Sequence, residues 1–334
     1  MSGERTGERR PIHGGMNRIA VLDTGYASYS YERELFRAHG YRLDLFQGTA
    51  EDREGKIRFA QDATGILVRG TVIDAGAMDQ LRNLKAIVRY GTGFENIDLA
   101  TAFAKGIRVA NVQGYANHAV SDHALGLMFA CIRAIGNTWP ESFGRPVRSD
   151  IFELHNKTLG IIGIGRIGSR FAIKTAPLFR QILACDPYQS AVTFRTTGAV
   201  KSNLEEVLEM SHVISVHCNL TEETYHMLNG ELLRSARQKP VIINTARGGV
   251  IEGAALLEAL NVGKVHSAGL DVFEQEPPGR AERSLLEHPR VIATPHVAWY
   301  SDQSMKELQQ RAADNLLALL QERAIPDEIK PGQV

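Results

Sequence analysis

The feature that most constrains the fold is an alternation, along almost the whole chain, of short apolar segments rich in β-branched residues with longer segments of helical periodicity. This alternation is typical of parallel α/β structure, in which each strand is followed by a crossover helix. The predicted strands form two successive series. The first covers 19–22, 42–45, 65–68, 86–88 and 109–111, and the second covers 159–162, 182–185, 213–216, 241–244, 267–270 and 291–293.

We therefore predict an α/β chain with two doubly wound parallel-sheet domains, which a length of 334 residues allows. Long helices are predicted at 118–135 and 303–323. The second of these follows a complete sheet and needs a surface to pack on, so we expect it to return to the first domain. The predicted domains are 1–117 plus 299–334, with 1–15 as a disordered tail, and 118–298.

Composition excludes several classes of protein. The formal net charge is +0, from 38 basic and 38 acidic residues, so the chain lacks the basic excess of a nucleic-acid-binding protein. It has neither a signal-peptide apolar region nor an apolar run of the ~18 residues that a membrane span needs. Cys131, Cys185 and Cys218 form no Cys-x-x-Cys pair, which argues against a disulfide framework or a zinc site. We predict a cytoplasmic protein with no metal, nucleic-acid or membrane partner.

One glycine-rich segment predicts a dinucleotide site. Residues 159–168 read LGIIGIGRIG, after a predicted strand and before a predicted helix. Gly163 allows a tight turn, Gly165 lets the backbone approach a pyrophosphate, and Gly168 permits close helix–strand packing. Arg166 and Ile167 open the helix, whose N-terminus attracts phosphate, and both are expected to bind the cofactor. The alternative is an unliganded strand–turn–helix unit.

Asp186 supports the dinucleotide interpretation and suggests which dinucleotide binds. It ends the next predicted strand, close to the ~20-residue spacing expected for the acidic residue that binds an adenosine ribose. A carboxylate there accepts hydrogen bonds from ribose hydroxyls and repels a 2′-phosphate. The predicted cofactor is therefore NAD rather than NADP, while a helix-capping aspartate is the alternative.

Four further segments resemble signatures of the D-isomer-specific 2-hydroxyacid dehydrogenase family. They are VRYGTGFENID at 88–98, NTARGGV at 244–250, GLDVFEQEP at 269–277 and TPH at 294–296. The resemblance covers roughly 19–321. The subgroup most similar is the one that contains the C-terminal-binding proteins, because VHC at 216–218 and AWYS at 298–301 match it. The resemblance implies two Rossmann- or flavodoxin-like lobes with a cleft between them.

The resemblance also implies a catalytic set of Arg247, Glu276 and His296 for NAD(H)-dependent interconversion of a 2-oxo acid and its D-(R)-2-hydroxy acid. A guanidinium can hold the carboxylate and polarise the carbonyl. An imidazole can donate the proton in reduction and accept it in oxidation, and a paired carboxylate orients it. Each residue follows the end of a predicted strand, where open α/β sheets bind ligands. Taken singly, they could be a helix-capping arginine, a loop glutamate and a buried histidine.

Several residues are expected to face the substrate. The amides around Gly91, Thr92 and Gly93 could hold a carboxylate, as glycine-rich turns do. By resemblance, Arg69 and Arg89 face the substrate, and the hypothesis is that it carries a second anionic group such as a phosphate, phosphonate or carboxylate. A surface salt bridge is the alternative for either arginine. Trp299 is expected to be a pocket wall, or else domain-interface packing.

Further cofactor contacts and partners follow from the resemblance alone. The implied contacts with NAD are Val120, His217, Cys218, Asn219, Leu220, Thr224, Thr245, Ala246, Asp271 and His296. The family pairs through its nucleotide-binding lobes, so a homodimer through the NAD-binding domains is expected. The alternative function is an NAD-sensing interaction protein of the C-terminal-binding-protein type without physiological turnover.

Overall fold

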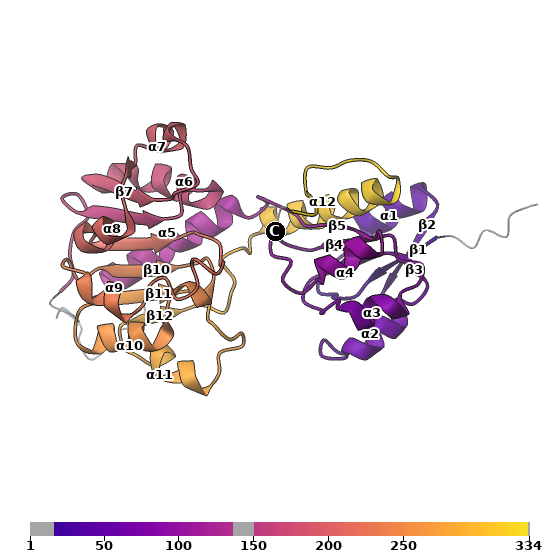
Figure 1. The fold of residues 1–334 in the computed structure, drawn as a ribbon, viewed down its shortest axis with the longest axis horizontal. Coiled ribbons are helices and arrows are strands. Elements are labelled where there is room, and N and C mark those ends of the chain that lie inside the picture. The colour runs from indigo at the N-terminus through magenta and orange to yellow at the C-terminus, as the bar shows by residue number, and fades with distance from the viewer. Residues whose placement is uncertain (1–16, 136–149, 333–334) are drawn as a thin grey trace, which may run out of the picture. The chain divides into compact units, whose positions relative to one another are not determined.

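A computed structural model describes residues 17–135 and 150–332 of the chain, so the predicted tail at 1–15 lies outside the described residues. The chain divides into two compact units (Figure 1). Unit 1 combines Met1–Tyr115 with Met305–Val334, and unit 2 is Ala116–Ser304. Each unit is built on its own mostly or entirely parallel sheet, which confirms the α/β prediction.

Unit 1 contains a six-stranded sheet in the order β13-β5-β4-β3-β1-β2, parallel except for β13. Its strands are β1 (Asn17–Val21), β2 (Tyr41–Leu45), β3 (Ala63–Val68), β4 (Ala86–Arg89), β5 (Arg108–Ala110) and β13 (Glu328–Ile329). Its helices are α1 (Ser30–Ala38), α2 (Arg53–Phe59), α3 (Ala75–Gln80), α4 (Leu99–Ala104) and most of α12 (Asp302–Leu320).

Local sequence explains where three of these helices begin. Asp52, Asp74 and Asp98 each precede a helix, and each carboxylate accepts a hydrogen bond from a backbone N–H in the first turn, at 2.8, 2.9 and 3.0 Å. An aspartate N-cap satisfies a donor that the helix itself leaves unpaired. The strands between these helices are apolar and buried, as expected for a sheet covered on both faces.

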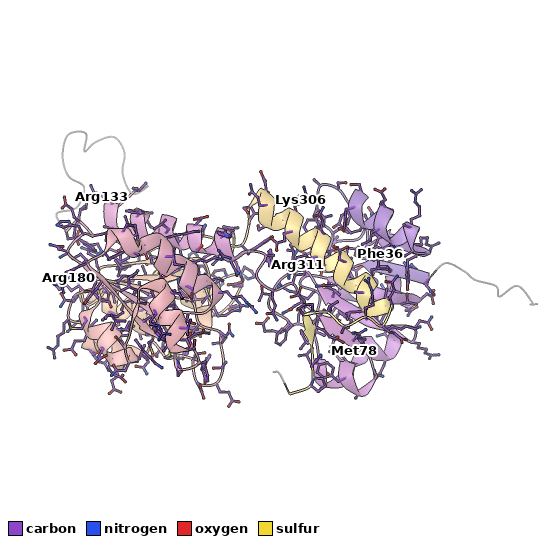
Figure 2. All side chains as sticks on the ribbon, turned by 90° about the horizontal axis from the view of Figure 1, so that it is seen from above. Phe36, Met78, Arg133, Arg180, Lys306 and Arg311 are labelled. Atoms are coloured by element: carbon purple, nitrogen blue, oxygen red, sulfur yellow. The ribbon has the colours of Figure 1, made fainter. Side chains whose placement is uncertain are left out.

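The last long helix, α12, packs in unit 1 beside α1 (Figure 1). Asp314 accepts a hydrogen bond from the Tyr31 hydroxyl at 2.8 Å. Arg311, labelled on α12 in Figure 2, donates to the Gln113 carbonyl at 3.0 Å and to Asp327 at 2.7 Å. These bonds tie the C-terminal segment to the N-terminal sheet, so unit 1 is discontinuous in sequence.

Unit 2 contains a seven-stranded parallel sheet in the order β12-β11-β10-β9-β6-β7-β8. Its strands are β6 (Thr158–Ile162), β7 (Gln181–Cys185), β8 (Val200–Lys201), β9 (Val213–Val216), β10 (Val241–Asn244), β11 (Ser267–Leu270) and β12 (Val291–Ala293). Its helices are α5 (Asn117–Arg133), α6 (Arg166–Thr175), α7 (Ala191–Thr197), α8 (Leu204–Met210), α9 (Gly230–Ser235), α10 (Gly253–Asn261) and α11 (Arg283–Leu286).

Both sheets reverse their winding direction at one point. In unit 1 the chain builds outward from β1 to β2 and then continues on the other side with β3. In unit 2 it builds from β6 to β7 and β8 and then continues on the other side with β9. Ligands of open α/β sheets bind outside the carboxyl ends of the strands at such a point. The segments after β1, β3, β6 and β9 are therefore the expected ligand-binding segments.

Candidate active site

The glycine-rich turn after β6 has the geometry that a bound pyrophosphate needs. Gly163 has φ +87°, and a Cβ there would lie 2.6 Å from the Cys218 backbone nitrogen. A Cβ on Gly168 would collide with the Gly163 carbonyl oxygen, whereas a Cβ on Gly165 would meet nothing within 4 Å. Gly165 is also the N-cap of α6 and supplies no side-chain cap. At Gly163 and Gly168 the space is thus filled by the protein itself, whereas Gly165 leaves space beside a helix N-terminus.

Two polar side chains at the same end of the sheet test whether a dinucleotide fits. Asp186, directly after β7, accepts hydrogen bonds from the N–H groups of Ile164 at 2.9 Å and Tyr188 at 3.0 Å. Each carboxylate oxygen keeps a lone pair for a ribose hydroxyl. The Thr245 hydroxyl, after β10, is buried and has no hydrogen-bond partner among the described residues. The glycine turn, the carboxylate and this buried hydroxyl fit the predicted cofactor NAD.

Glu276 and His296 form a hydrogen-bonded pair in unit 2. The imidazole Nδ1 lies 2.5 Å from the carboxylate Oε2, and the two side chains are 44% and 35% exposed. His296 has φ +52°, a left-handed conformation that costs a non-glycine residue free energy. Its N–H donates to the Asp271 carbonyl at 2.9 Å, which helps to hold that conformation. The Nε2 edge of the ring is therefore the one directed away from the carboxylate.

The charge of Glu276 is stabilised by its surroundings. Burial alone would raise the pKa of this carboxyl group, but the hydrogen bonds from His296 and from the Phe273 N–H and the charges of His296 and Arg247 outweigh it and lower the pKa. The Arg247 guanidinium also donates to the Ala246 carbonyl at 2.8 Å. Arg247 and His296, which follow β10 and β12, thus both act on the charge of Glu276, which follows β11 in unit 2.

Asp271 braces the turn that carries His296. Its side chain is fully buried, and Oδ1 accepts from the Thr294 hydroxyl at 2.5 Å and from the Val297 N–H at 3.0 Å, while Oδ2 accepts from the Ala298 N–H at 2.9 Å. His123 Nε2 lies 2.9 Å from the same Thr294 hydroxyl. The carboxylate that the resemblance assigns to the cofactor is therefore used by the protein itself, in fixing residues 294–298.

Trp299 contributes to the same turn. Its indole N–H donates to the His296 carbonyl at 2.9 Å, and its ring packs edge-on against Tyr300. The hydrogen bond to the His296 carbonyl therefore sets the orientation of the indole. The structure places Trp299 within three residues of His296 and in contact with it.

In unit 1, Arg89 lies across Gly91. Gly91 has φ +135°, and a Cβ at this position would occupy the place of the Arg89 guanidinium. The carbonyls of Gly91 and Thr92 accept hydrogen bonds from the Val112 N–H at 2.9 Å and the Asn111 amide at 2.6 Å, which hold the turn. The N–H groups of Gly91, Thr92 and Gly93 have no hydrogen-bond partner within 17–135 and 150–332. Arg69 follows β3, which is the neighbour of β4 in the sheet.

The remaining predicted cofactor contacts in unit 2 differ in how far they are buried. Val120 is buried in α5, Asn219 and Leu220 are exposed after β9, and Thr224 is half-buried. The His217 ring packs against Phe171 and lies 2.9 Å from the Ser215 hydroxyl. Burial lowers the pKa of His217 to about 3, so its side chain is a neutral, packed group. Burial also raises the pKa of Cys218 to about 11, so this thiol stays protonated.

Sequence reasoning missed Asp23 and Lys56, which form an ion pair at 2.7 Å in unit 1. The available signal was an aspartate directly after a buried strand, the same signal that identified Asp186. It also missed the contact of His123 with the turn before His296, because the two lie far apart in the sequence.

The described residues contain neither a metal-binding cluster nor a helix that could span a membrane. No group of three or more His, Cys, Asp or Glu side chains in 17–135 and 150–332 is arranged to hold a metal ion. No helix in these ranges combines the length and apolar character that crossing a membrane requires.

Comparisons with known proteins agree with this geometry. The NAD-binding-domain model of the D-isomer-specific 2-hydroxyacid dehydrogenases matches residues 125–298. The glycerate dehydrogenase of Methylorubrum extorquens is 35% identical over 304 residues, which cover 86% of this chain and 91% of the relative. The D-3-phosphoglycerate dehydrogenase of Archaeoglobus fulgidus is 34% identical over 269 residues, and this chain spans 50% of its length.

A solved structure shows the same fold. The D-lactate dehydrogenase from Aquifex aeolicus, complexed with NAD and lactic acid, superposes with a TM-score of 0.79 at 27% identity, over 92% of this chain and 96% of that one. The family match and the shared fold agree with the NAD site predicted from the glycine-rich turn. The chain belongs to the D-isomer-specific 2-hydroxyacid dehydrogenase family and is an NAD-dependent oxidoreductase.

Proposed function

We propose that this protein interconverts a small 2-oxo acid and its D-(R)-2-hydroxy acid, with Arg247, Glu276 and His296 as the catalytic set. The observation that carries the proposal is the Glu276–His296 pair, 2.5 Å apart in unit 2, with the Arg247 charge acting on the same carboxylate. NADH, when bound, supplies the hydride. No Ser or Cys nucleophile is part of the set, so acyl transfer is not implied.

Each of the three residues has one task in reduction. The Arg247 fork binds the substrate carboxylate and polarises the carbonyl through two N–H donors. Protonated His296 donates its Nε2 proton to the oxygen as negative charge develops there, and in oxidation it takes the proton back. Glu276 fixes the ring through Nδ1 and stabilises the imidazolium. The contact of Nδ1 with Glu276 holds the ring in one direction, which favours proton transfer at Nε2.

We propose in addition that the substrate carries a second anionic group, a phosphate, phosphonate or carboxylate, bound by Arg69 and Arg89. The free amides of residues 91–93 are suited to the common 2-oxo carboxylate, because a concave run of N–H groups binds anions. The guanidinium groups of Arg69 and Arg89 lie in the same unit and are suited to a further anionic group. The names of the glycerate and phosphoglycerate relatives are consistent with a substrate of this kind.

A substrate panel tests both parts. The purified chain with NADH is offered glyoxylate and pyruvate, which carry one negative charge, and oxaloacetate and 3-phosphohydroxypyruvate, which carry more. We expect turnover, with kcat/KM higher for the multiply charged acids by about tenfold or more. His296→Asn should lower kcat by about 10²–10⁴. Complete inactivity with every acid would contradict the dehydrogenase, and a preference for the singly charged acids would contradict only the second anion.

Two other expectations concern the assembly and its location. The homodimer through the NAD-binding domains and the cytoplasmic location stay predictions. Sedimentation of the purified chain at micromolar concentration would test the dimer, and a purely monomeric species would contradict it.

A further inference from the structure

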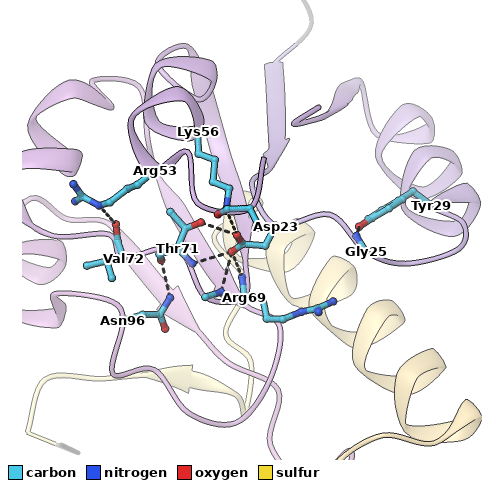
Figure 3. Close-up of polar contacts among 11 residues, drawn as sticks. Asp23, Gly25, Tyr29, Arg53, Lys56, Arg69, Thr71, Val72 and Asn96 are labelled. Atoms are coloured by element: carbon cyan, nitrogen blue, oxygen red, sulfur yellow. Dashed lines mark hydrogen bonds and ion pairs between the residues drawn. The ribbon is translucent and has the colours of Figure 1, made fainter. Parts of the chain in front are cut away.

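The turn after β3, which carries Arg69, is held by one carboxylate. Asp23 Oδ2 accepts hydrogen bonds from three successive backbone N–H groups, those of Arg69 at 2.7 Å, Gly70 at 2.9 Å and Thr71 at 3.0 Å (Figure 3). Asp23 Oδ1 accepts from the Thr71 hydroxyl at 2.6 Å. A run of successive N–H groups is an anion-binding arrangement, and here the protein supplies the anion itself.

The charge of Asp23 is balanced by a buried lysine. Lys56 Nζ donates to Asp23 Oδ1 at 2.7 Å and to the Ala50 carbonyl at 2.6 Å, and its side chain is only 5% exposed. Burial alone would raise the pKa of Asp23, but the bonds from Lys56, Thr71 and the backbone hold it well below its ordinary value. Asp23 is therefore ionised, and its geometry is fixed from two sides.

The other end of Arg69 meets the same segment that supplies Asp23. Figure 3 shows the Arg69 side chain extending away from the Asp23 carboxylate, toward the stretch that leads to Tyr29. Its guanidinium carbon lies 5.3 Å from the centre of the Tyr26 ring, which itself packs edge-on against Tyr29 and Tyr90. Residues 23–26 thus grip Arg69 at its backbone and at its guanidinium.

We propose that Asp23 is a positioning residue for substrate recognition: it fixes the 69–71 turn and so presents Arg69 to the second anionic group of the substrate. Asp23 follows β1 and Arg69 follows β3, the two neighbouring strands at which the unit 1 sheet reverses its winding. This is the position at which α/β sheets bind ligands. A preorganised arginine loses less side-chain freedom on binding, so an anchored turn favours affinity. The inference rests on the proposed role of Arg69.

A double-mutant cycle tests it. Asp23→Asn removes the negative charge and replaces one of the two acceptor oxygens with an amide donor, and Arg69→Ala removes the guanidinium. With oxaloacetate or 3-phosphohydroxypyruvate, we expect Arg69→Ala to lower kcat/KM by about 100-fold and Asp23→Asn by about tenfold, mainly through KM. With pyruvate, Asp23→Asn should leave kcat/KM within about twofold. The double variant should match Arg69→Ala within about twofold, because Asp23 acts through Arg69.

Two further variants keep the test decisive. Asp44→Asn is the control, since Asp44 pairs with Arg18 at 2.6 Å in the same unit but makes no bond to the 69–71 turn, and it should not discriminate between the acids. If Asp23→Asn does not fold, Thr71→Val removes only the hydroxyl bond to Asp23 and should show the same selectivity, about two- to fivefold. If Arg69→Ala leaves kcat/KM for the multiply charged acids unchanged, the second-anion proposal and this inference are overturned together. Two other outcomes overturn the role of Asp23 alone, provided that Arg69→Ala has the expected effect. In the first, the losses in kcat/KM of the two single variants multiply in the double variant. In the second, Asp23→Asn lowers kcat/KM for pyruvate as much as for the multiply charged acids.

Discussion

His296 Nδ1 lies 2.5 Å from Glu276 Oε2, although the two residues are 20 positions apart and follow different strands. The bond leaves Nε2 as the only ring atom of His296 that can exchange a proton with a substrate. The carboxylate also stays ionised in mildly acidic solution, because its pKa is lowered. The ionised carboxylate therefore remains available to hold the imidazole in one orientation.

Glu276→Gln should lower kcat for reduction by about 10–100-fold, with a smaller change in KM. The amide keeps an acceptor for Nδ1 but carries no charge, so protonated imidazole is no longer stabilised. Stopped-flow measurement of NADH oxidation over a range of substrate concentrations gives both kcat and KM. An unchanged kcat would remove Glu276 from the mechanism. Glu274→Gln is the control, because Glu274 lies on the same loop as Glu276 but pairs with His226.

Asp271→Asn should destabilise unit 2 by about 2–3 kcal/mol, because a buried carboxylate that accepts three hydrogen bonds loses its charge. It should also lower kcat, since the turn that carries His296 loosens. The dissociation constant of NADH should stay within about twofold, because the side chain is fully buried. Urea unfolding and NADH fluorescence titration measure the two quantities.

The matched control for Asp271 is Asp122→Asn. Asp122 pairs with Lys174 at 2.6 Å but is 65% exposed, so its loss should cost at most about 1 kcal/mol. If Asp271→Asn weakened NADH binding by more than tenfold while the free energy of unfolding stayed the same, Asp271 would be a cofactor ligand, as the family resemblance implied.

Much of the fold could be predicted from the sequence because buried parallel strands are continuous apolar runs. The predicted strands at 213–216, 241–244, 267–270 and 291–293 agree with the structure residue by residue. The two strands that were missed, β8 and β13, have two residues each and carry no periodicity. Their place in the sheets depends on partners elsewhere in the chain, such as β5 for β13.

The site could be predicted less completely, because a sequence gives a residue's position but not its hydrogen-bond partners. Glu276 and His296 were predicted to pair, and the structure contains that pair. Asp271 shows the limit. Its place after β11 is the same whether it faces a ligand or the protein, and only the bonds to 294–298 distinguish the two. Asp23 was missed for a related reason, since its partners come from a different strand.

Asp186→Ser should raise the preference for NADPH over NADH, measured as the ratio of kcat/KM values, by at least about tenfold. The substitution removes the charge that repels a 2′-phosphate. It also removes the acceptor for the Ile164 N–H, so KM for NADH should rise as well. Glu205→Gln is the control, because its charge lies in the same region and affects the Cys185 thiol together with Asp186. Unchanged cofactor preference in Asp186→Ser would place the ribose elsewhere.

The Asp23–Lys56 pair predicts a pH-dependent contribution to stability. The folded-state pKa of Asp23 lies well below its ordinary value, so its contribution is fully present above that ordinary value, at about pH 4, and is lost as the pH falls toward the folded-state pKa. Breaking a buried pair by removing one charge costs about 3–5 kcal/mol. Asp23→Asn should therefore be about 3 kcal/mol less stable than the parent chain near pH 7, with the difference shrinking below about pH 4.

Urea unfolding of the parent chain and of Asp23→Asn over a pH series measures this difference. Asp79→Asn provides the comparison in the same unit: Asp79 pairs with Lys105 at 2.7 Å but is 68% exposed, so its effect should stay below about 1 kcal/mol at every pH. A stability difference for Asp23→Asn that stayed constant down to about pH 3 would mean that the carboxylate is not held ionised by Lys56 and the 69–71 turn. Because the same bonds anchor Arg69, that result would also weaken the case for Asp23 in substrate recognition.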